Sequence, residues 1–406
     1  MSDLELVVRD LALLCTMDET QGDGVLGVRR HAAVAFQGGR VAWIGDSDAA
    51  PDAPVVWSLP GAVALPGLVD CHTHAVWAGS RSDEFERRLA GEDYSAILEA
   101  GGGILSTVRA TRAADDAALV ALCAARLHRI AARGVTTVEI KSGYGLTPAH
   151  ERRLLLAAKE AGEQVGIRVL TTFLGAHTVP AELRGDRAAY VRQVIEEQLP
   201  AVADAATFVD VYVDRGAFTV DEGAAILRAG RDAGLMPRIH AEQVTYTGAA
   251  AMAAGLGASS ADHLERLDDD GVSALAAAGT VAVMLPGAML YLRDPSPPVP
   301  ALRDAGVPLA VASDLNPGTS PVHDLLTSAT LASVMMRLTV EEALLGITAN
   351  AGRALRRPDL GRVVPGGPGD LVAFRVAPGE APTPAALIQH LGGASVAAVV
   401  SAGALR

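Results

Sequence analysis

The stretch Leu65–Gly79 reads LPGLVDCHTHAVWAG, and the interpretation of the whole chain starts from it. Leu68, Val69, Asp70 and Cys71 are typical of the end of a buried strand, and His72 and His74 follow at a spacing of two. On an extended backbone, residues i and i+2 point to the same face, so both imidazoles can reach one metal ion. The alternative is a pair of solvent-facing histidines at a strand end, and ligands elsewhere in the chain must decide between the two.

The totals of the sequence restrict the class of protein. With 406 residues, of which 50% are hydrophobic, the chain is long enough for one large barrel and a smaller domain. It contains no uncharged apolar run of about 18 residues, and its first ten residues lack a basic segment followed by an apolar one, so we expect neither a membrane span nor a secretory signal. A net charge of -13 argues against nucleic acid as a partner. Three cysteines without a disulfide or thiolate–metal spacing favour the reducing cytoplasm.

Apolar, β-rich segments alternate with helical ones from about Gly67 onward. Eight parallel strands joined by helices close a (β/α)8 barrel. The eight segments are Gly67–His72, Val135–Lys141, Ile167–His177, Thr207–Val213, Met236–His240, Ser259–His263, Thr280–Pro286 and Pro308–Asp314, and helical stretches such as Pro148–Ala161, Asp186–Val202 and Val220–Ala233 lie between them. The connection from Ala75 to Gly134 is unusually long, and loops of this kind more often cover a site than fill space.

Both ends of the chain have a different pattern from the middle. Residues 1–62 form short strands, with a hairpin turn at Gly38-Gly39 between two apolar runs. Residues from about Gly361 onward are again strand-like and rich in glycine and proline. We therefore predict a distorted (β/α)8 TIM barrel at residues 65–358, inserted between residues 1–64 and 359–406, which together form a small β-sandwich domain.

Histidines and one aspartate recur where the barrel segments end. His240 ends the fifth segment in RIHAEQ, His263 ends the sixth in ADHLE, and Asp314 ends the eighth in VASDLNPG. His177 ends the third segment and is a further candidate. Catalytic groups of such barrels lie at the carboxyl ends of the strands, so we expect these side chains to meet the two histidines of the opening stretch. The remaining histidines are expected in helices or loops without a functional role: His31, His128, His150, His323 and His390.

Three neutral imidazoles and one carboxylate are an ordinary donor set for a divalent ion such as zinc or iron. The sequence therefore predicts a metal site with the ligands His72, His74, His240 and Asp314. A barrel whose strand-end histidines are merely structural is the alternative, and protein that contains no bound metal after expression would favour it.

Longer motifs carry a resemblance to a known family. PGLVDCHTH, the lone histidine of the fifth segment, DHLE in the sixth and the aspartate of the eighth are similar to the amidohydrolase superfamily of metal-dependent hydrolases. Within it, the chain resembles the imidazolonepropionases, the ring-opening enzymes of histidine breakdown, from about Leu65 to Arg353 and more weakly in both termini. The motifs that carry this resemblance are DEFERRLAGEDY, GGGILSTVRATR, EIKSGYGLT, FLGAHTVP, DVYVDRGAF, LPGAMLYL, DLNPGTSP and ITANAGRAL.

The resemblance implies a reaction and two roles in it. A metal-activated water would attack the ring carbonyl of 4-imidazolone-5-propanoate and open the C–N bond to give N-formimino-L-glutamate. Asp314 would bind the metal, accept the water proton and pass it to the leaving nitrogen. For His263, two roles stay open: a hydrogen bond near the water or carbonyl, or orientation of Asp314.

The resemblance also bears on the number of metal ions. Some members of the superfamily use two metals bridged by a modified lysine on the fourth strand, whereas the fourth segment here, TFVDVYVD, contains no lysine. We therefore expect one divalent or trivalent ion per chain, zinc or iron. Lys141 on the second segment is expected to be a salt-bridged lysine inside the barrel, with a ligand role as the alternative.

The family motifs place the substrate as well. Its propionate would pair with Arg81, because the planar fork of arginine suits a carboxylate. The other expected substrate contacts are Tyr144, His177 and Gln243, with Asn316, Gly318 and Thr319 at the other end of the substrate and Tyr94 as a weaker candidate.

Gln243 departs from the family pattern, because many members have glutamate at this position. Glutamine can hydrogen-bond the ring but cannot act as a base, so the proton transfer is expected to rest on Asp314.

Two other functions stay open on this evidence. The same scaffold serves related cyclic-amide hydrolases and heteroaromatic deaminases, and the metal ligands do not distinguish these, whereas Arg81, Tyr144 and Asn316 favour a carboxylate-bearing imidazolone. A metal-binding protein without catalysis is the other alternative. A homodimer would be usual for such a barrel, although the sequence contains no interface signature.

Overall fold

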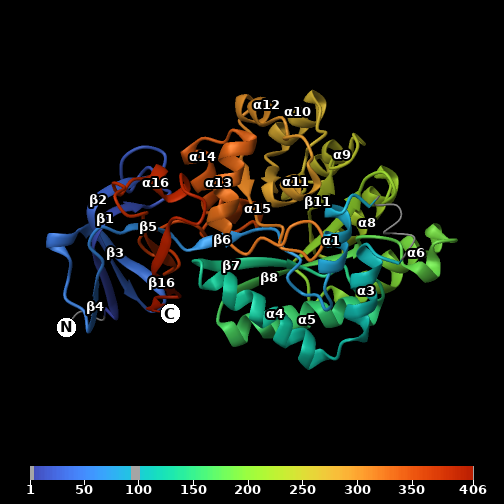
Figure 1. The fold of residues 1–406 in the computed structure, drawn as a ribbon, viewed down its shortest axis with the longest axis horizontal. Coiled ribbons are helices and arrows are strands. Elements are labelled where there is room, and N and C mark those ends of the chain that lie inside the picture. Colours follow the sequence, from blue (N-terminus) through green and yellow to red (C-terminus); the bar gives the residue numbers. More distant parts are fainter. Residues whose placement is uncertain (1–3, 93–100, 406) are drawn as a thin grey trace.

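The computed structural model describes residues 4–92 and 101–405, and their strands form two sheets (Figure 1). The first sheet has eight strands in the order β17-β16-β15-β5-β1-β2-β3, with β4 paired to β1. Its strands come from both ends of the chain: β1 Leu6–Cys15, β2 Val28–Gln37, β3 Arg40–Asp46, β4 Val55–Ser58, β5 Val63–Pro66, β15 Leu371–Arg375, β16 Ser395–Ser401 and β17 Ala404–Leu405. One mixed sheet built from both termini therefore forms the small domain, at the end of the molecule where both termini lie (Figure 1).

The second sheet is the barrel. It has nine strands in the order β14-β13-β12-β11-β9-β8-β7-β6, with the short β10 paired to β9, and the printed pairs within it are parallel. Its strands are β6 Leu68–Asp70, β7 Val135–Lys141, β8 Arg168–Ala176, β9 Phe208–Val213, β10 Met236–Pro237, β11 Ile239–Ala241, β12 Ser260–His263, β13 Val281–Met284 and β14 Leu309–Val311. Because β10 and β11 are two parts of one barrel strand, separated at Arg238, the barrel has the eight strands that the sequence predicts.

The barrel closes just beyond its first and last strands. Thr73, which follows β6, forms an isolated parallel bridge with Leu315, which follows β14. The backbone N–H of His74 donates to the carbonyl oxygen of Leu315 at 2.9 Å, and that of Asp314 donates to the carbonyl oxygen of His72 at 3.0 Å. The segments that carry three of the predicted metal ligands are therefore hydrogen-bonded to each other.

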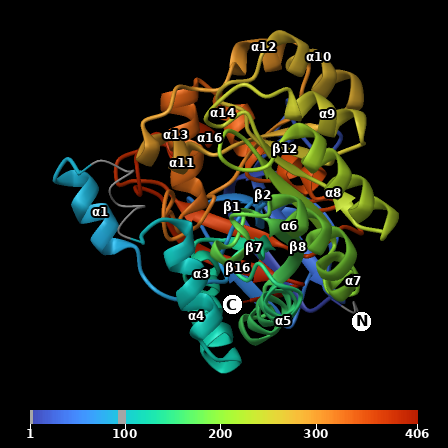
Figure 2. The same ribbon diagram turned by 90° about the vertical axis from the view of Figure 1, so that its right-hand side faces the viewer.

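Helices surround the barrel strands, as Figure 2 shows. The polar ends of several helices are capped by side chains, for example by a reciprocal capping box between Thr219 and Glu222 at the start of α8. The helices are α1 Ser82–Leu89, α3 Ile104–Ala113, α4 Asp116–Ala131, α5 Pro148–Val165, α6 Arg187–Gln193, α7 Leu199–Val202, α8 Val220–Asp232, α9 Ala249–Gly255, α10 Asp269–Ala278, α11 Pro286–Leu292, α12 Val299–Asp304, α13 Leu325–Met336, α14 Val340–Gly346, α15 Ala349–Ala354 and α16 Pro384–Ile388. None of the described helices has the length and apolarity needed to cross a membrane.

The small domain and the barrel share an apolar core. Leu13, Leu65 and Phe374 of the first sheet belong to the same buried cluster as the barrel residues, and the other face of that sheet has a cluster of its own. Polar contacts add to this junction: Arg168 of β8 pairs with Asp370 at 2.8 Å. The first sheet therefore packs on the barrel rather than standing apart from it.

The predicted barrel and the small β domain from both termini are confirmed by this topology. The hairpin at Gly38-Gly39 is confirmed too, because Gln37 pairs with Arg40 and both glycines have positive φ. The domain limits at residues 64/65 and 358/359 stay a prediction, and β5, which spans the first of them, pairs with β1 and β15 of the first sheet.

One expectation about the histidines was wrong. His31 lies in strand β2 rather than in a helix or loop, because the strand begins at Val28, before the apolar run that marks it in the sequence, and its polar first residues pair with β1. His31 is exposed, so it breaks the apolar pattern without interrupting the strand.

Candidate metal centre and substrate site

Three histidines meet at one end of the barrel. His72 and His74 follow β6, and His240 lies in β11. One nitrogen of each ring lies within 4.8 Å of one nitrogen of both others, and all three side chains are buried. The ring centroids of His72 and His240 are 4.6 Å apart. The spacing of two at the end of β6 therefore brings two imidazoles to a common point with a third, as the sequence predicts.

Two aspartates fix the orientation of these rings. The Nδ1 atom of His72 lies 2.6 Å from a carboxylate oxygen of Asp262, and that of His240 lies 3.0 Å from a carboxylate oxygen of Asp210. A carboxylate accepts, so each Nδ1 carries the proton and each Nε2 carries the free electron pair. Both Nε2 atoms are buried and have no hydrogen-bond partner among the described residues. Such atoms fit a metal ion, which would supply the missing partner.

The charge state of the three imidazole rings also suits metal binding. Burial holds the pKa of His72, His74 and His240 below the usual range for histidine. At neutral pH these imidazoles are therefore uncharged, which is the form that binds a metal.

Asp314 completes the cluster. It follows β14 with a positive φ of 51°, and one of its carboxylate oxygens lies 3.5 Å from Nε2 of His72 and 3.5 Å from Nε2 of His74. Burial raises the pKa of Asp314 to about 7, although the charge of His263 lowers it. The four side chains predicted as metal ligands therefore lie together, with their ligating atoms facing one another.

Lys141 lies in a buried ionic network beneath this cluster. Its Nζ atom is 2.8 Å from Glu139 and 2.9 Å from Asp210, and all three side chains are inaccessible to solvent. Arg238 pairs with Asp262 at 3.1 Å and donates to the carbonyl oxygen of Cys71 at 2.7 Å. The expectation of a salt-bridged lysine inside the barrel is confirmed.

The partners of this network were not singled out from the sequence. Asp210 stands inside the apolar strand FVDVYV and Asp262 inside SADH, and a charged residue in such a strand is a signal that could have revealed both. Arg238 gives the same signal, because it is a charged residue within the fifth barrel strand, between β10 and β11. In the structure its side chain is fully buried.

His263 lies beside the three histidines, with its ring centroid 5.5 Å from that of His240 and 6.0 Å from that of His72. Its Nδ1 atom is 3.6 Å from a carboxylate oxygen of Glu265. Burial alone would lower the pKa of His263, but the neighbouring Glu265 raises it above the usual value for histidine. The structure thus places His263 next to the cluster, facing an acid that the sequence reasoning had not considered.

Tyr144 and His177 form one side of the site. The ring of His177 stacks on His74, with centroids 5.1 Å apart and planes 19° from parallel, and its Nδ1–H donates to the carbonyl oxygen of Gly143 at 3.1 Å. Burial lowers the pKa of His177 to about 3, so this ring is neutral. Tyr144 lies 6.0 Å from His74 between ring centroids, and burial raises its pKa, so the hydroxyl keeps its proton.

A buried glutamate fixes the loop that carries Tyr144. Glu151 of α5 accepts backbone hydrogen bonds from Gly143 at 2.9 Å, Gly145 at 2.8 Å and Leu146 at 2.6 Å. Gly143 has a φ of 94°, and a Cβ atom there would lie 2.9 Å from Nδ1 of His177. Glycine is therefore required where this loop passes the histidine.

Arg81 stands over the loop that follows Asp314. Its guanidinium pairs with Glu84 at 2.7 Å, and a Cβ atom on Gly318 would lie only 2.8 Å from its Nη1 atom. Arg88 donates to the carbonyl oxygen of Gly318 at 3.1 Å. The long connection between the first two barrel strands thus covers the loop after the eighth strand, in agreement with the role expected for it.

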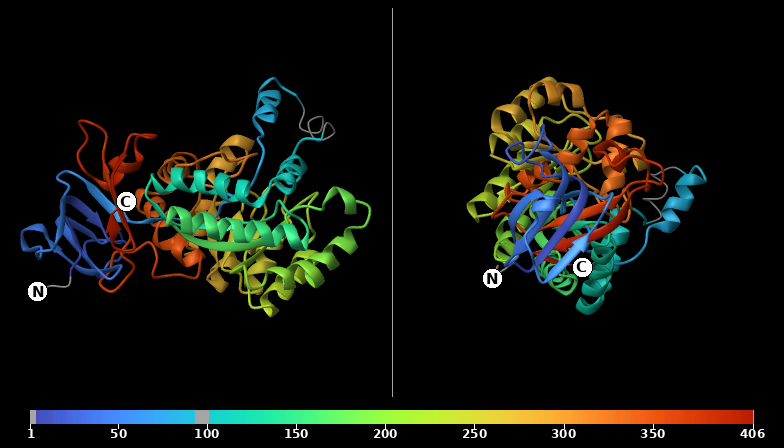
Figure 3. Two further views of the ribbon diagram at one scale, coloured as in Figure 1. Left: turned by 90° about the horizontal axis from the view of Figure 1, so that it is seen from below. Right: turned by 90° about the vertical axis from the view of Figure 1, so that its left-hand side faces the viewer.

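Helix α1, which follows Arg81, stands away from the barrel (Figure 3). Two of its residues contact the rest of the protein. The ring centroid of Phe85 is 6.0 Å from that of Tyr291 at the end of α11. Glu84 accepts a hydrogen bond from the backbone N–H of Gly103 at 3.0 Å. Tyr94, the weaker substrate candidate, lies outside the described residues.

Asn316 is engaged within its own loop. Its side-chain oxygen accepts from the backbone N–H groups of Gly318 at 2.9 Å and Thr319 at 2.8 Å, and its amide donates to the carbonyl oxygen of Asp314 at 2.8 Å. The side chain therefore shapes the loop next to Asp314, and in this conformation a ligand would meet the loop rather than a free amide.

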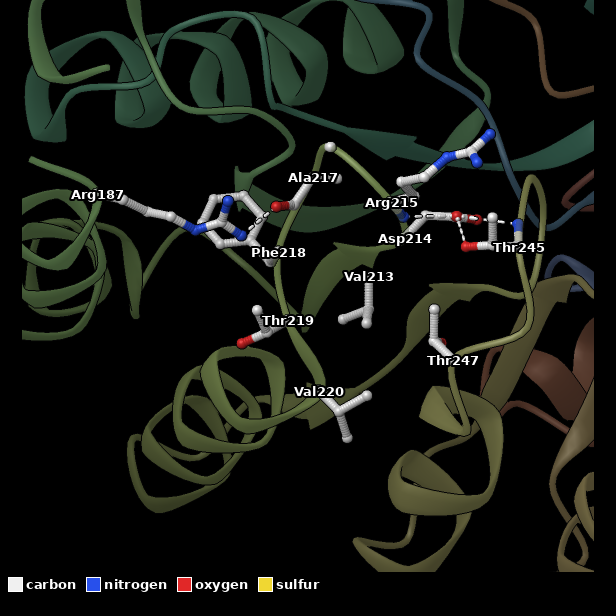
Figure 4. A pocket seen from close by; sticks show the side chains of 11 residues that line it. Arg187, Val213, Asp214, Arg215, Ala217, Phe218, Thr219, Val220, Thr245 and Thr247 are labelled. Atoms are coloured by element: carbon white, nitrogen blue, oxygen red, sulfur yellow. Dashed lines mark hydrogen bonds between the residues drawn. The ribbon is translucent and has the colours of Figure 1, made fainter. Parts of the chain in front are cut away.

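Gln243 is buried at the end of the fifth barrel strand, three residues after His240. The segment that follows it is fixed by Asp214, whose carboxylate accepts from the backbone N–H groups of Val244 at 2.7 Å and Thr245 at 3.0 Å. Figure 4 shows Asp214 directed at Thr245. Asp214 was not singled out from the sequence, although DVYVDRGAF contains it.

The groove drawn in Figure 4 has a volume of about 390 Å³. None of the predicted site residues lines it, and its two arginines differ in their surroundings: Arg187 pairs with Glu222 at 2.8 Å, whereas Arg215 is exposed. The predicted site residues therefore lie away from this groove.

Comparisons with known proteins agree with this geometry. The model of the amidohydrolase family matches residues 63–405. The imidazolonepropionase of Cupriavidus taiwanensis is 47% identical over 92% of this chain and 90% of its own length, and that of Paracoccus denitrificans is 45% identical over 90% and 92%.

Solved structures are similar at the level of the fold. An adenosine deaminase from Xanthomonas campestris with bound zinc superposes with a TM-score of 0.76 at 17% identity, covering 99% of this chain and 92% of that one. The atrazine chlorohydrolase of Arthrobacter aurescens complexed with zinc gives a TM-score of 0.74 at 17% identity, covering 98% and 94%. At these identities the likeness concerns the fold alone.

Proposed function

Because this chain belongs to the amidohydrolase family, and within it to the imidazolonepropionases, we propose that it hydrolyses 4-imidazolone-5-propanoate to N-formimino-L-glutamate in histidine degradation. The observation that carries this proposal is the convergence of His72, His74 and His240 on Asp314 at one end of the barrel. Arg81, a cation for the substrate's carboxylate, stands over Gly318 in the loop that follows Asp314, where a Cβ atom would lie 2.8 Å from its Nη1 atom.

His72, His74, His240 and Asp314 hold one metal ion, zinc or iron, in this proposal. The two unpartnered Nε2 atoms and the adjacent carboxylate oxygen support it. When bound, the ion supplies Lewis-acid activation of a water molecule and of the ring carbonyl. A single ion agrees with the fourth barrel strand, which has no lysine, and with Lys141, which is already engaged by Glu139 and Asp210.

Asp314 moves the proton. The oxygen of the attacking water bonds to the ring carbonyl carbon, and the bond from that carbon to the ring nitrogen breaks. Asp314 accepts the proton that the water loses and delivers it to the departing nitrogen, so the carboxylate is regenerated.

The remaining site residues orient the substrate. Arg81 binds the propionate carboxylate, and Gly318 leaves room for its guanidinium. Tyr144, His177 and Gln243 contact the ring, while the loop of Asn316 and Thr319 offers backbone groups to the other end of the substrate. His263 lies beside the reacting carbonyl, donating or accepting a hydrogen bond there.

The proposal includes the cellular compartment and the oligomeric state. Three buried cysteines without a disulfide agree with a reducing cytoplasm. A homodimer is the assembly that we propose for the barrel.

The test is a direct assay. Purified protein of known metal content is incubated with freshly prepared 4-imidazolone-5-propanoate, and the ultraviolet absorbance of the ring and the product mass are followed. We expect loss of the ring absorbance and gain of one water. No reaction from folded, metal-loaded protein refutes the proposal and moves the assignment to related cyclic-amide hydrolases or heteroaromatic deaminases, for which hydantoins, cytosine and guanine serve as parallel substrates.

A further inference from the structure

Glu265 is a buried acid to which the reaction as proposed gives no task. Its side chain is 1% exposed, and neither carboxylate oxygen has a hydrogen-bond partner among the residues that the structure describes. The nearest basic atom is Nδ1 of His263, 3.6 Å from one of these oxygens, and this nitrogen also has no hydrogen-bond partner within the described chain. Two unpartnered buried groups of complementary chemistry therefore face each other.

An unusual backbone brings the two side chains together. His263 and Leu264 have φ values of 82° and 74°, and two consecutive left-handed residues turn the chain sharply after β12. The neighbouring strand end fixes this turn: the backbone N–H of Leu264 donates to Ala241 at 3.1 Å, and that of Arg266 donates to Glu242 at 2.7 Å. The position of Glu265 relative to His263 is thus set by the barrel and not by a flexible loop.

The charges around Glu265 leave His263 as its partner. Arg266, the adjacent cation, pairs with Asp294 at 3.6 Å. Within the part of the chain that the structure covers, the ion pair of 4.0 Å or less that involves Glu265 is the one with His263. The two other acids near Glu265, Asp294 and Asp314, are repelled by its negative charge, and burial together with this charge raises the pKa of both. The imidazole of His263 is therefore the neighbouring group that can compensate this charge.

We propose that Glu265 is a positioning residue for ring opening: its carboxylate accepts the Nδ1–H proton of His263 and so presents Nε2 of this imidazole to the reacting carbonyl. The inference rests on the proposed function. A separation of 3.6 Å is slightly long for a hydrogen bond, and such contacts shorten when substrate fills a site. The arrangement repeats that of His72 with Asp262 and His240 with Asp210, in which a carboxylate fixes the tautomer of a ring at the same end of the barrel.

The test compares Glu265→Gln with Asp294→Asn, a nearby carboxylate that is paired with Arg266 instead. In the metal-loaded protein with 4-imidazolone-5-propanoate, we expect Glu265→Gln to lower kcat about 10- to 100-fold, with KM within twofold of wild type and unchanged metal content. Asp294→Asn should keep wild-type kcat. His263→Asn combined with Glu265→Gln should be no slower than His263→Asn alone, because both changes remove the same function.

A second measurement uses wild-type protein, so that it gives an answer even where Glu265→Gln does not fold. In zinc-loaded wild-type protein with ¹⁵N-labelled histidine, the signal of His263, assigned by its loss in His263→Asn, should show the tautomer protonated at Nδ1. Protonation at Nε2 alone, or a kcat for folded Glu265→Gln within twofold of wild type, overturns the role of Glu265. Wild-type protein that does not open the ring refutes the proposed function instead, and the tautomer measurement still decides about the contact.

Discussion

The Nε2 atom of His72 and a carboxylate oxygen of Asp314 lie 3.5 Å apart, across the seam where the first and last strands of the barrel meet. The same seam is closed by the hydrogen bond from the backbone N–H of Asp314 to the carbonyl oxygen of His72, at 3.0 Å. Three of the predicted metal ligands, His72, His74 and Asp314, are thus held by the backbone contacts that close the barrel. A metal ion held by His72 and Asp314 would therefore also connect the first and the last strand of the barrel.

Asp314→Asn should reduce turnover of 4-imidazolone-5-propanoate about a thousandfold, because the amide can neither accept the water proton nor release it to the leaving nitrogen. Initial rates at equal metal occupancy measure this effect. The exposed Asp304→Asn, from the neighbouring helix α12, is the control and should behave as wild type. A near-normal rate for folded Asp314→Asn would overturn the role assigned to this residue.

Gln243→Glu should retain ring-opening activity within about tenfold of wild type, because the proposed proton route runs through Asp314 and general acid–base contributions exceed this range. Steady-state kinetics on metal-loaded protein provide the measurement. Complete loss of activity in a folded variant with normal metal content would show that the charge at this buried position matters to the reaction.

Asp210→Asn should weaken metal binding about 10- to 100-fold, because the amide accepts more weakly from Nδ1 of His240 than the carboxylate does. It should also lower the free energy of unfolding by about 3 kcal/mol, since Lys141 loses one of its two close carboxylates. Competition with a chelator and urea unfolding give the two values. The exposed Asp232→Asn on α8 should change neither, and wild-type affinity in Asp210→Asn would contradict the role of the network.

Gly318→Ala should raise KM for the imidazolone about tenfold while leaving the melting temperature within about 2 °C of wild type. The added Cβ would lie 2.8 Å from Nη1 of Arg81, and the tip of a long side chain moves aside more easily than backbone. Displacing the guanidinium costs substrate affinity rather than stability. Gly185→Ala is the matched control, because its Cβ would meet no atom within 4 Å. An unchanged KM would contradict the proposal that Arg81 binds the substrate.

The cysteines should be inert in the folded protein. Burial raises the pKa of Cys15 and of Cys123 to about 12, and that of Cys71 is raised by burial as well. At pH 8 an aromatic disulfide reagent should therefore detect three thiols in urea and almost none in native protein. Rapid labelling of native protein would contradict the burial of these side chains.

The same thiols give stability a defined pH dependence. An unfolded thiol ionises near its ordinary pKa of 9.0, whereas the folded chain keeps Cys15 protonated up to about 12. The unfolded state therefore binds fewer protons between these values, and the free energy of unfolding falls as the pH rises from 9 toward 12. Urea unfolding of wild type and of Cys15→Ala across this range should show a smaller decrease for the variant.

Much of the site was predictable because its residues follow barrel strands. The carboxyl ends of parallel strands meet at one edge, so His72, His240 and Asp314 could be brought together from their positions alone. Asp210 and Glu265 were missed for a common reason. Asp210 contacts a histidine of another strand, and Glu265 faces His263 across a left-handed turn, so these contacts exist only in the folded chain. The charge of Asp210 inside an apolar strand is the one local signal that the sequence contains for either residue.

The sequence by itself determined the alternation of strands and helices and the hairpin at Gly38-Gly39, and it predicted the set of metal ligands, because these depend on local periodicity and on which side chains end a strand. Only the tertiary structure decided which nitrogen of His72 and of His240 is free, since that depends on Asp262 and Asp210 from other strands. It also decided that the amide of Asn316 is used within its own loop. Hydrogen-bond partners are chosen by distances in space, and the chain acquires those distances only when the barrel closes.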